Sequence, residues 1–102
     1  NKKIMICGAG EIATSFIPYL YDNNELIFSN RNSDKLVKLK QQYPKIKIIP
    51  FNQRKILLDQ VNILISATAS PHLIFNRDDF ISSQLIRFLV ILIKLLLFNV
   101  LI

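Results

Sequence analysis

Short apolar runs alternate along this chain with longer segments in which apolar residues recur every three or four positions. The apolar runs at 3–7, 25–29, 45–50 and 61–66 have the length of buried β-strands. Segments 11–21 and 33–43 have apolar residues at helical spacing, and 52–60 predicts a short helix or helical turn. This alternation is typical of a parallel sheet with helices on both faces. The sequence therefore predicts an α/β fold with a doubly wound parallel sheet.

Prolines and polar residues mark where the predicted helices bend, begin and end. Pro18 stands inside the first helical segment, where it removes a hydrogen bond at a cost of about 3 kcal/mol, so a kink is expected between Thr14 and Pro18. Asn32 or Ser33 can cap the second helix, and Pro44 stops it. Asn76 can cap a further short helix.

The last eighteen residues, 85–102, are apolar except for Arg87, Lys94 and Asn99. That length is near the lower limit of a membrane span, but Lys94 would lie near the middle of the bilayer. The alternative is a fifth buried strand at 88–93 followed by an atypical end. We expect a nucleotide-binding domain at 1–84 and an apolar tail at 85–102, truncated relative to a complete domain of this class.

Length and composition limit the chemistry that the chain can support. With 102 residues it is one domain, and the net charge of +6 is compatible with nucleic acid, a membrane surface or an anionic cofactor. One cysteine, Cys7, and one histidine, His72, exclude an internal disulfide and a multi-cysteine or multi-histidine metal site. Cys7 is expected to be a small buried side chain. No signal peptide is recognisable, so a cytoplasmic location is expected.

The segment Gly8-Ala9-Gly10-Glu11-Ile12-Ala13 fits the pattern G-x-G-x-x-G/A between a strand and a helix. In this pattern the first glycine makes a tight turn, the second lets a pyrophosphate approach the backbone, and the small third residue keeps helix and sheet close. The phosphate would lie on unpaired amides at the start of the helix. The segment predicts dinucleotide binding, and the alternative is a glycine turn with a structural role only.

The end of the second predicted strand distinguishes between two cofactors. NAD-binding domains usually have Asp or Glu there, but this chain has Asn30, Arg31 and Asn32, with no carboxylate before Asp34. Arg31 can form a bidentate pair with a 2′-phosphate, and Asn30 and Asn32 are expected to contribute to the same site. The expected cofactor is NADP, and the alternative is a solvated loop arginine.

The fourth predicted strand ends in Ser66, Ala67 and Thr68, followed by Ala69-Ser70-Pro71-His72. Ligands of open α/β sheets bind at the carboxyl ends of the strands, so these small residues are expected to border the nicotinamide ribose. A simple connecting loop is the alternative.

In order and spacing, "GAGEIA", "FSNRNSDK" and "ILISATASPHLIF" resemble the nucleotide-binding domain of glutamyl-tRNA reductase, from Lys3 to about Phe80. The resemblance implies an NADPH-dependent oxidoreductase of tetrapyrrole biosynthesis that reduces a glutamyl thioester, formed from glutamyl-tRNA, to glutamate-1-semialdehyde. In that family the thioester forms on a cysteine of a separate N-terminal domain, and a C-terminal helical domain forms the dimer. We expect neither domain in this chain, so no catalytic residue is assigned and the chain alone is expected to be inactive.

Two other functions remain open at this stage. A shikimate- or quinate-type dehydrogenase would use the same cofactor, although Glu11 and Ser66 favour the reductase. A non-catalytic nucleotide-binding remnant, with a tail that associates with a membrane or a partner, is the second. Contact with tRNA is conceivable because the chain is basic, but its charges are dispersed and no RNA site is assigned.

Overall fold

Four parallel strands form one sheet at the centre of the computed structural model, which describes residues 1–67. The strands are β1 (Lys3–Cys7), β2 (Glu25–Ser29), β3 (Lys47–Ile48) and β4 (Ile63–Ser66). Their order in the sheet is β3-β2-β1-β4, so the chain crosses first to one side of β1 and then to the other. This is the order of a Rossmann-type sheet, and the predicted doubly wound fold is confirmed.

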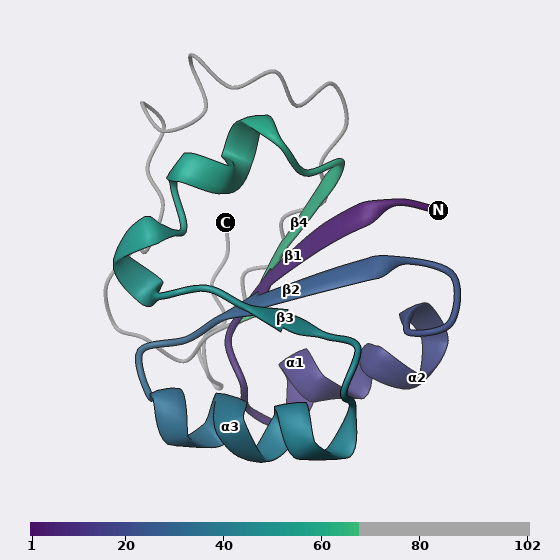
Figure 1. The fold of residues 1–102 in the computed structure, drawn as a ribbon, viewed down its shortest axis with the longest axis vertical. Helices are drawn as coiled ribbons and strands as arrows, with labels where there is room; N and C mark the ends of the chain where they lie inside the picture. Colours follow the sequence, from purple (N-terminus) through teal and green to yellow (C-terminus); the bar gives the residue numbers. More distant parts are fainter. Residues whose placement is uncertain (68–102) are drawn as a thin grey trace, which may run out of the picture.

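Helical segments cover both faces of the sheet (Figure 1). The helices α1 (Glu11–Ser15), α2 (Ile17–Leu20) and α3 (Ser33–Gln42) lie on one side. Two 3-10 helices, η1 (Phe51–Gln53) and η2 (Ile56–Asp59), form the connection from β3 to β4 on the other side. The helical turn predicted at 52–60 is therefore present, in 3-10 form.

The side chains of the strands alternate between two buried clusters, one on each face. On the α-helical face the strands contribute Ile4, Ile6, Leu26, Phe28 and Ile65, which pack with Ala13, Ile17, Leu36, Leu39 and Ile46. On the opposite face they contribute Met5, Cys7, Ile27 and Leu64, which pack with Leu58 and Val61. Full burial of a large aliphatic side chain contributes about 1.5–3 kcal/mol, so both layers stabilise the sheet.

The first helical segment breaks where the proline predicts a kink. Helix α1 ends at Ser15, Phe16 joins the two helices, and α2 has Pro18 within its first two positions. Pro18 has no amide hydrogen to continue the α-helical pattern, and the amide of Tyr19 donates to the Phe16 carbonyl at 3.1 Å instead. The segment is thus two short helices in place of one bent helix.

The third strand is shorter than predicted. Only Lys47 and Ile48 pair with β2, although the apolar run spans 45–50. The amide of Ile46 donates to the Tyr43 carbonyl at 3.1 Å, so Ile46 still belongs to the turn after α3. Pro50 has no amide hydrogen and cannot extend the ladder at the other end.

The fourth strand begins at Ile63, two residues later than predicted. Asn62 lies just outside it and pairs with Lys3 through both its backbone and its side chain. Its amide donates to the Lys3 carbonyl at 2.8 Å, and its Oδ1 accepts from the Lys3 amide at 2.9 Å. The side-chain oxygen thus replaces a backbone acceptor of the ladder.

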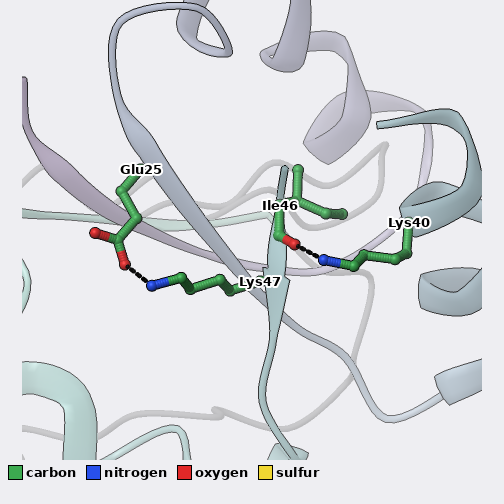
Figure 2. Close-up of polar contacts among 4 residues, drawn as sticks. All are labelled: Glu25, Lys40, Ile46 and Lys47. Carbon is green, nitrogen blue, oxygen red and sulfur yellow. Dashed lines mark hydrogen bonds and ion pairs between the residues drawn. The ribbon is translucent and has the colours of Figure 1, made fainter. Parts of the chain in front are cut away.

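Two lysines form polar contacts at the edge strand β3 and at the residue before it (Figure 2). Lys47 Nζ lies 2.8 Å from Glu25 Oε2 on β2, and Lys40 Nζ of α3 donates to the Ile46 carbonyl. The hydrogen bond from Lys47 lowers the pKa of the Glu25 carboxyl. Because this ion pair is exposed, it orients the edge more than it stabilises the fold.

Several sequence predictions lie outside the described residues. These are the fifth strand at 88–93, the tail at 85–102, the domain boundary at 84, the Asn76 cap and the loop from Thr68 to His72. Within residues 1–67, no helix has the length and apolar character needed to cross a membrane.

Candidate nucleotide-binding site

The turn after β1 depends on glycine at position 8. Gly8 has a φ of +128°, which L-amino acids rarely adopt, and its amide donates to the Ser29 carbonyl at 2.9 Å. A Cβ at this position would lie 2.0 Å from the carbonyl oxygen of Ala67. That carbonyl belongs to a fixed backbone, because the Ala67 amide donates to the Cys7 carbonyl at 2.9 Å. Gly8 is therefore required by the fold itself.

Gly10, in contrast, is not required by the packing of the described chain. It precedes α1 with an extended backbone (φ −82°, ψ −172°), and no heavy atom lies within 4 Å of the position where its Cβ would be. Its carbonyl accepts the Thr14 amide at 3.0 Å, so it begins the helix. The open space beside Gly10 is on the exposed surface of the turn, where a ligand could approach the backbone.

The remaining residues of the glycine segment surround this turn. Ala13 is buried, and its Cβ lies 3.5 Å from the Cβ position of Gly8, so a small residue here lets α1 approach the turn closely. Ala9 is half-buried and Glu11 is exposed in the first turn of α1. Ile12 follows Glu11 in the helix backbone. The binding roles predicted for these residues stay predictions.

The loop after β2 uses two asparagines to hold its own shape. Asn30 Nδ2 donates to the Asn32 carbonyl at 3.1 Å, and Asn32 Oδ1 accepts the Asp34 amide at 3.0 Å as the cap of α3. Arg31, between them, is exposed. The structure thus gives both asparagines a loop-forming role and leaves Arg31 as the cation that the loop presents.

The three predicted site segments meet at one edge of the sheet. Cys7 pairs in register with Ser29 on one side and with Ser66 on the other, so the residues that follow β1, β2 and β4 are neighbours. Ser66 and Ala67 are both buried, and Thr68 lies outside the described residues. The hydroxyl of Ser29 is buried at this edge and has no hydrogen-bond partner within residues 1–67.

Cys7 is a core residue at the same edge. Its side chain is buried, and burial raises the pKa of its thiol to about 12, although the positive charge of Arg54 acts in the opposite direction. A thiol with such a pKa is protonated at neutral pH and is a poor nucleophile. The structure agrees with the buried role predicted for Cys7.

Sequence reasoning missed Phe51, which contacts Arg31, and Arg54, which contacts the same ring. The Arg31 guanidinium lies 5.1 Å from the ring centroid of Phe51, and the Arg54 guanidinium lies 3.9 Å from the same centroid. Phe51 and Arg54 come from the segment after β3, about twenty residues further along the chain. Only the position of that segment after a parallel strand could have indicated that it reaches the same edge.

Comparison with known proteins agrees with this geometry. The family model described as Shikimate / quinate 5-dehydrogenase matches residues 1–92. The chain belongs to this family.

The chain is similar to several glutamyl-tRNA reductases. That of Clostridium novyi (strain NT) is 37% identical over 80 residues, which cover 76% of this chain and 20% of the relative. The solved glutamyl-tRNA reductase of Methanopyrus kandleri superposes with a TM-score of 0.67 and 26% identity, over 78% of this chain and 20% of that one. The nucleotide binding domain of the Thermoplasma volcanium enzyme shares the fold, with a TM-score of 0.71 and 23% identity, over 80% of this chain and 59% of that one.

These matches confirm the resemblance to the nucleotide-binding domain of glutamyl-tRNA reductases. They support a glutamyl-tRNA reductase over a shikimate dehydrogenase as the kind of enzyme that this domain is similar to. The chain spans about a fifth of the length of the curated relatives it matches. It therefore corresponds to one part of such an enzyme, the part that the Thermoplasma volcanium structure names the nucleotide binding domain.

Proposed function

We propose that this chain binds NADPH across the carboxyl edge of its sheet, as the cofactor domain of a glutamyl-tRNA reductase. The observation that carries the proposal is the arrangement of this edge. The open backbone at Gly10 and the exposed cation of Arg31 follow two adjacent strands, β1 and β2. NADPH has a pyrophosphate that could lie against the backbone at Gly10 and a 2′-phosphate that could pair with Arg31.

The residues present fit the cofactor at both positions. A side chain at Gly10 would occupy the space that the pyrophosphate needs, and this space is free of described atoms. Asn30 and Asn32 fix the loop, so that Arg31 is presented from a defined backbone. A guanidinium binds phosphate by two parallel hydrogen bonds, and a carboxylate at the same place would repel it.

When bound, the cofactor supplies hydride for the reduction of a glutamyl group derived from glutamyl-tRNA. In the described residues, the chain contributes binding and orientation: Gly10 and its neighbours hold the pyrophosphate, and Arg31 holds the 2′-phosphate. Ser66 and Ala67, with Thr68, would border the nicotinamide ribose. Cys7 takes no part in forming a thioester, because its thiol is buried and protonated. Thioester formation, tRNA binding and dimerisation would belong to other parts of a full-length enzyme, and the cytoplasmic location stays a prediction.

A titration of the purified chain with NADPH and with NADH tests the proposal. Because the sequence has no tryptophan, the fluorescence of the reduced nicotinamide is free of tryptophan background. We expect NADPH to bind more tightly. Arg31→Glu should weaken NADPH binding about 10- to 100-fold, which corresponds to the loss of one or more charged hydrogen bonds, and should change NADH binding far less.

Lys2→Glu is the matched control for the change in charge. Lys2 precedes β1 and therefore lies at the amino edge of the sheet, opposite the proposed site. The Lys2→Glu variant should leave the affinities for NADPH and NADH nearly unchanged. Equal losses of NADPH and NADH binding in Arg31→Glu would contradict the 2′-phosphate role, and a folded chain that binds neither would contradict the proposed function.

A shikimate- or quinate-type dehydrogenase is the second candidate, favoured by the description of the family model that matches residues 1–92. It predicts the same cofactor preference, so the titration does not separate the two. Supplying the chain with the catalytic domain of each enzyme type in turn would do so. Reduction of glutamyl-tRNA with the first supports the reductase, and oxidation of shikimate with the second supports the alternative.

A further inference from the structure

The guanidinium of Arg31 lies over the aromatic ring of Phe51, which belongs to the segment after β3. The Arg31 Cζ is 5.1 Å from the ring centroid, inside the limit of about 6 Å for a cation–π contact. Arg31 is exposed in the loop after β2, and Phe51 is half-buried at the start of η1. The segment after β3 therefore contacts the side chain to which the proposed function assigns the 2′-phosphate.

Phe51 is held in place by contacts other than the one with Arg31. It packs against the buried cluster on the face opposite the α-helices, which includes Ile27 and Leu58. The amide and the Nη1 of Arg54 donate to the Phe51 carbonyl at 3.2 and 2.8 Å, and the Arg54 Cζ lies 3.9 Å from the ring centroid. The ring is therefore a fixed surface against which the exposed Arg31 side chain can rest.

The sheet itself brings this ring to the loop after β2. The amide of Ile49 donates to the carbonyl of Phe28 at 3.0 Å, so the chain just before Phe51 is still bonded to β2 near its end. Pro50, with a φ of −59°, leads directly from this bond into η1. The loop that carries Arg31 begins at the same end of β2.

A cation–π contact orients a guanidinium group without using its hydrogen-bond donors. An aromatic ring lies against the face of the group, whereas the N–H donors point outward in its plane. A phosphate binds at the edge of the group through two parallel hydrogen bonds. Asn30 and Asn32 fix the backbone around Arg31, but an arginine side chain has several rotatable bonds of its own. The ring of Phe51 favours one position of this side chain before a ligand binds.

Resting on the proposed function, we propose that Phe51 is a positioning residue for Arg31. Its ring keeps the guanidinium at the place from which the donors bind the 2′-phosphate of NADPH, and so contributes to the preference for NADPH over NADH. Phe51 itself contacts no phosphate. The preference then depends on two segments of the chain: the loop after β2 supplies the cation, and the segment after β3 orients it.

The strength of the contact sets the size of the expected effect. A cation–π contact at an exposed site raises the population of the stacked position about 2- to 5-fold, so removal of the ring lowers the NADPH affinity by at most that factor. Phe51→Leu keeps an apolar side chain against the core and removes the ring. Titration of the full chain should show NADPH binding weakened about 2- to 5-fold and NADH binding unchanged. Phe51→Tyr keeps a ring and should bind both nucleotides as the wild type does.

Phe16→Leu is the matched control for the substitution. Phe16 is also half-buried, but it packs against the core on the α-helical face, so its replacement should leave the preference for NADPH intact. A double-mutant cycle tests the coupling to Arg31. In the Arg31→Ala chain, Phe51→Leu should not change the NADPH affinity further, because no guanidinium remains to be oriented. Circular dichroism establishes that each variant is folded before it is titrated.

Nuclear magnetic resonance of the wild-type chain tests the contact itself, without any nucleotide and without any variant. The ring current of Phe51 should shift the δ-methylene protons of Arg31 upfield from their positions in the urea-unfolded chain. Phe51→Leu should remove this shift. Absence of the shift in the folded wild type would mean that the ring does not hold Arg31, and the inference would be wrong.

The titrations separate failure of this inference from failure of the proposed function. If Phe51→Leu leaves the preference for NADPH unchanged while Arg31→Glu removes it, the inference is wrong and the proposed function stands. If Phe51→Leu weakens both nucleotides equally, or if Phe51→Tyr is as weak as Phe51→Leu, the ring does not act through Arg31 and the inference is also wrong. If the wild-type chain binds neither nucleotide, the proposed function fails and this inference fails with it.

Discussion

Replacing Gly8 by alanine should strongly lower the free energy of unfolding of the domain. The new Cβ would lie 2.0 Å from the Ala67 carbonyl oxygen and 3.0 Å from its carbon, on a residue with a φ of +128°. Strained backbone of this kind costs about 1–3 kcal/mol, and overpacking against a fixed group costs about 1–3 kcal/mol more. We therefore expect a loss of about 2–6 kcal/mol, from a total stability of about 5–15 kcal/mol for an ordinary domain.

The Ala67 carbonyl cannot easily move away from the new methyl group. Its residue is hydrogen-bonded to the Cys7 carbonyl, and Gly8 is hydrogen-bonded to the Ser29 carbonyl, each at 2.9 Å. A shift that made room would break a bond between β1 and one of its neighbours. The new methyl group therefore either strains the backbone or breaks a hydrogen bond of β1.

Urea unfolding followed by far-ultraviolet circular dichroism measures this loss, and Gly10 provides the matched control. Gly10→Ala adds the same methyl group into open space, on a backbone that any residue adopts, so it should cost at most about 1 kcal/mol through a poorer helix cap. Gly10→Val should also fold but should bind neither NADPH nor NADH, because its side chain would occupy the pyrophosphate space. A Gly8→Ala protein within about 1 kcal/mol of wild type would refute the argument about the turn. Unchanged nucleotide affinity in a folded Gly10→Val protein would show that the second glycine has no binding role.

Two further predictions concern stability. Asn32→Ala should lower the free energy of unfolding by about 1 kcal/mol, because the Asp34 amide loses its acceptor. Asn32→Ser should lose much less, because a serine hydroxyl can accept the same hydrogen bond. Urea unfolding measures both variants, and equal stabilities would contradict the capping role of Asn32. Glu25→Gln should cost no more than about 0.5 kcal/mol at pH 7, because its ion pair with Lys47 is exposed. Since the pKa of Glu25 is lowered in the folded state, this contribution is present above the ordinary pKa of glutamate and disappears as the pH falls through the lowered value. If the difference in free energy of unfolding between wild type and Glu25→Gln grew as the pH fell, this assignment would be wrong.

The central strands could be predicted from sequence because their boundaries are local. Both β1 and β2 were expected at the residues where they occur, since each is a five-residue run limited by glycine or by asparagines. The edge strand β3 was predicted too long, because an alternation of lysine and isoleucine does not reveal that Ile46 remains hydrogen-bonded to the turn after α3. The break at Phe16 followed from Pro18 alone. Local rules therefore succeeded wherever the deciding contact lies within a few residues.

The positions of the segments that form the candidate site were predictable from the sequence, but the contacts between them were not. The glycine turn and Arg31 follow from motif chemistry, and the parallel register brings their segments together. The roles of Asn30 and Asn32 in shaping the loop required the hydrogen bonds to be seen. The contact of Arg54 with Phe51 beside Arg31 depends on the path of the chain from β3 to β4, which no spacing in the sequence encodes.

Each segment of the proposed site pairs a residue that fixes the backbone with one that is left open to a ligand. After β1, Gly8 is required by the turn and Gly10 faces open space. After β2, the asparagines hold the loop and Arg31 is exposed. Gly8 is hydrogen-bonded to β2, and the asparagines are hydrogen-bonded within their loop and to the start of α3, so Gly10 and Arg31 are presented in defined places before any ligand arrives. Such preorganisation lowers the entropic cost of binding, which explains how a short chain could retain affinity for the phosphates of a dinucleotide.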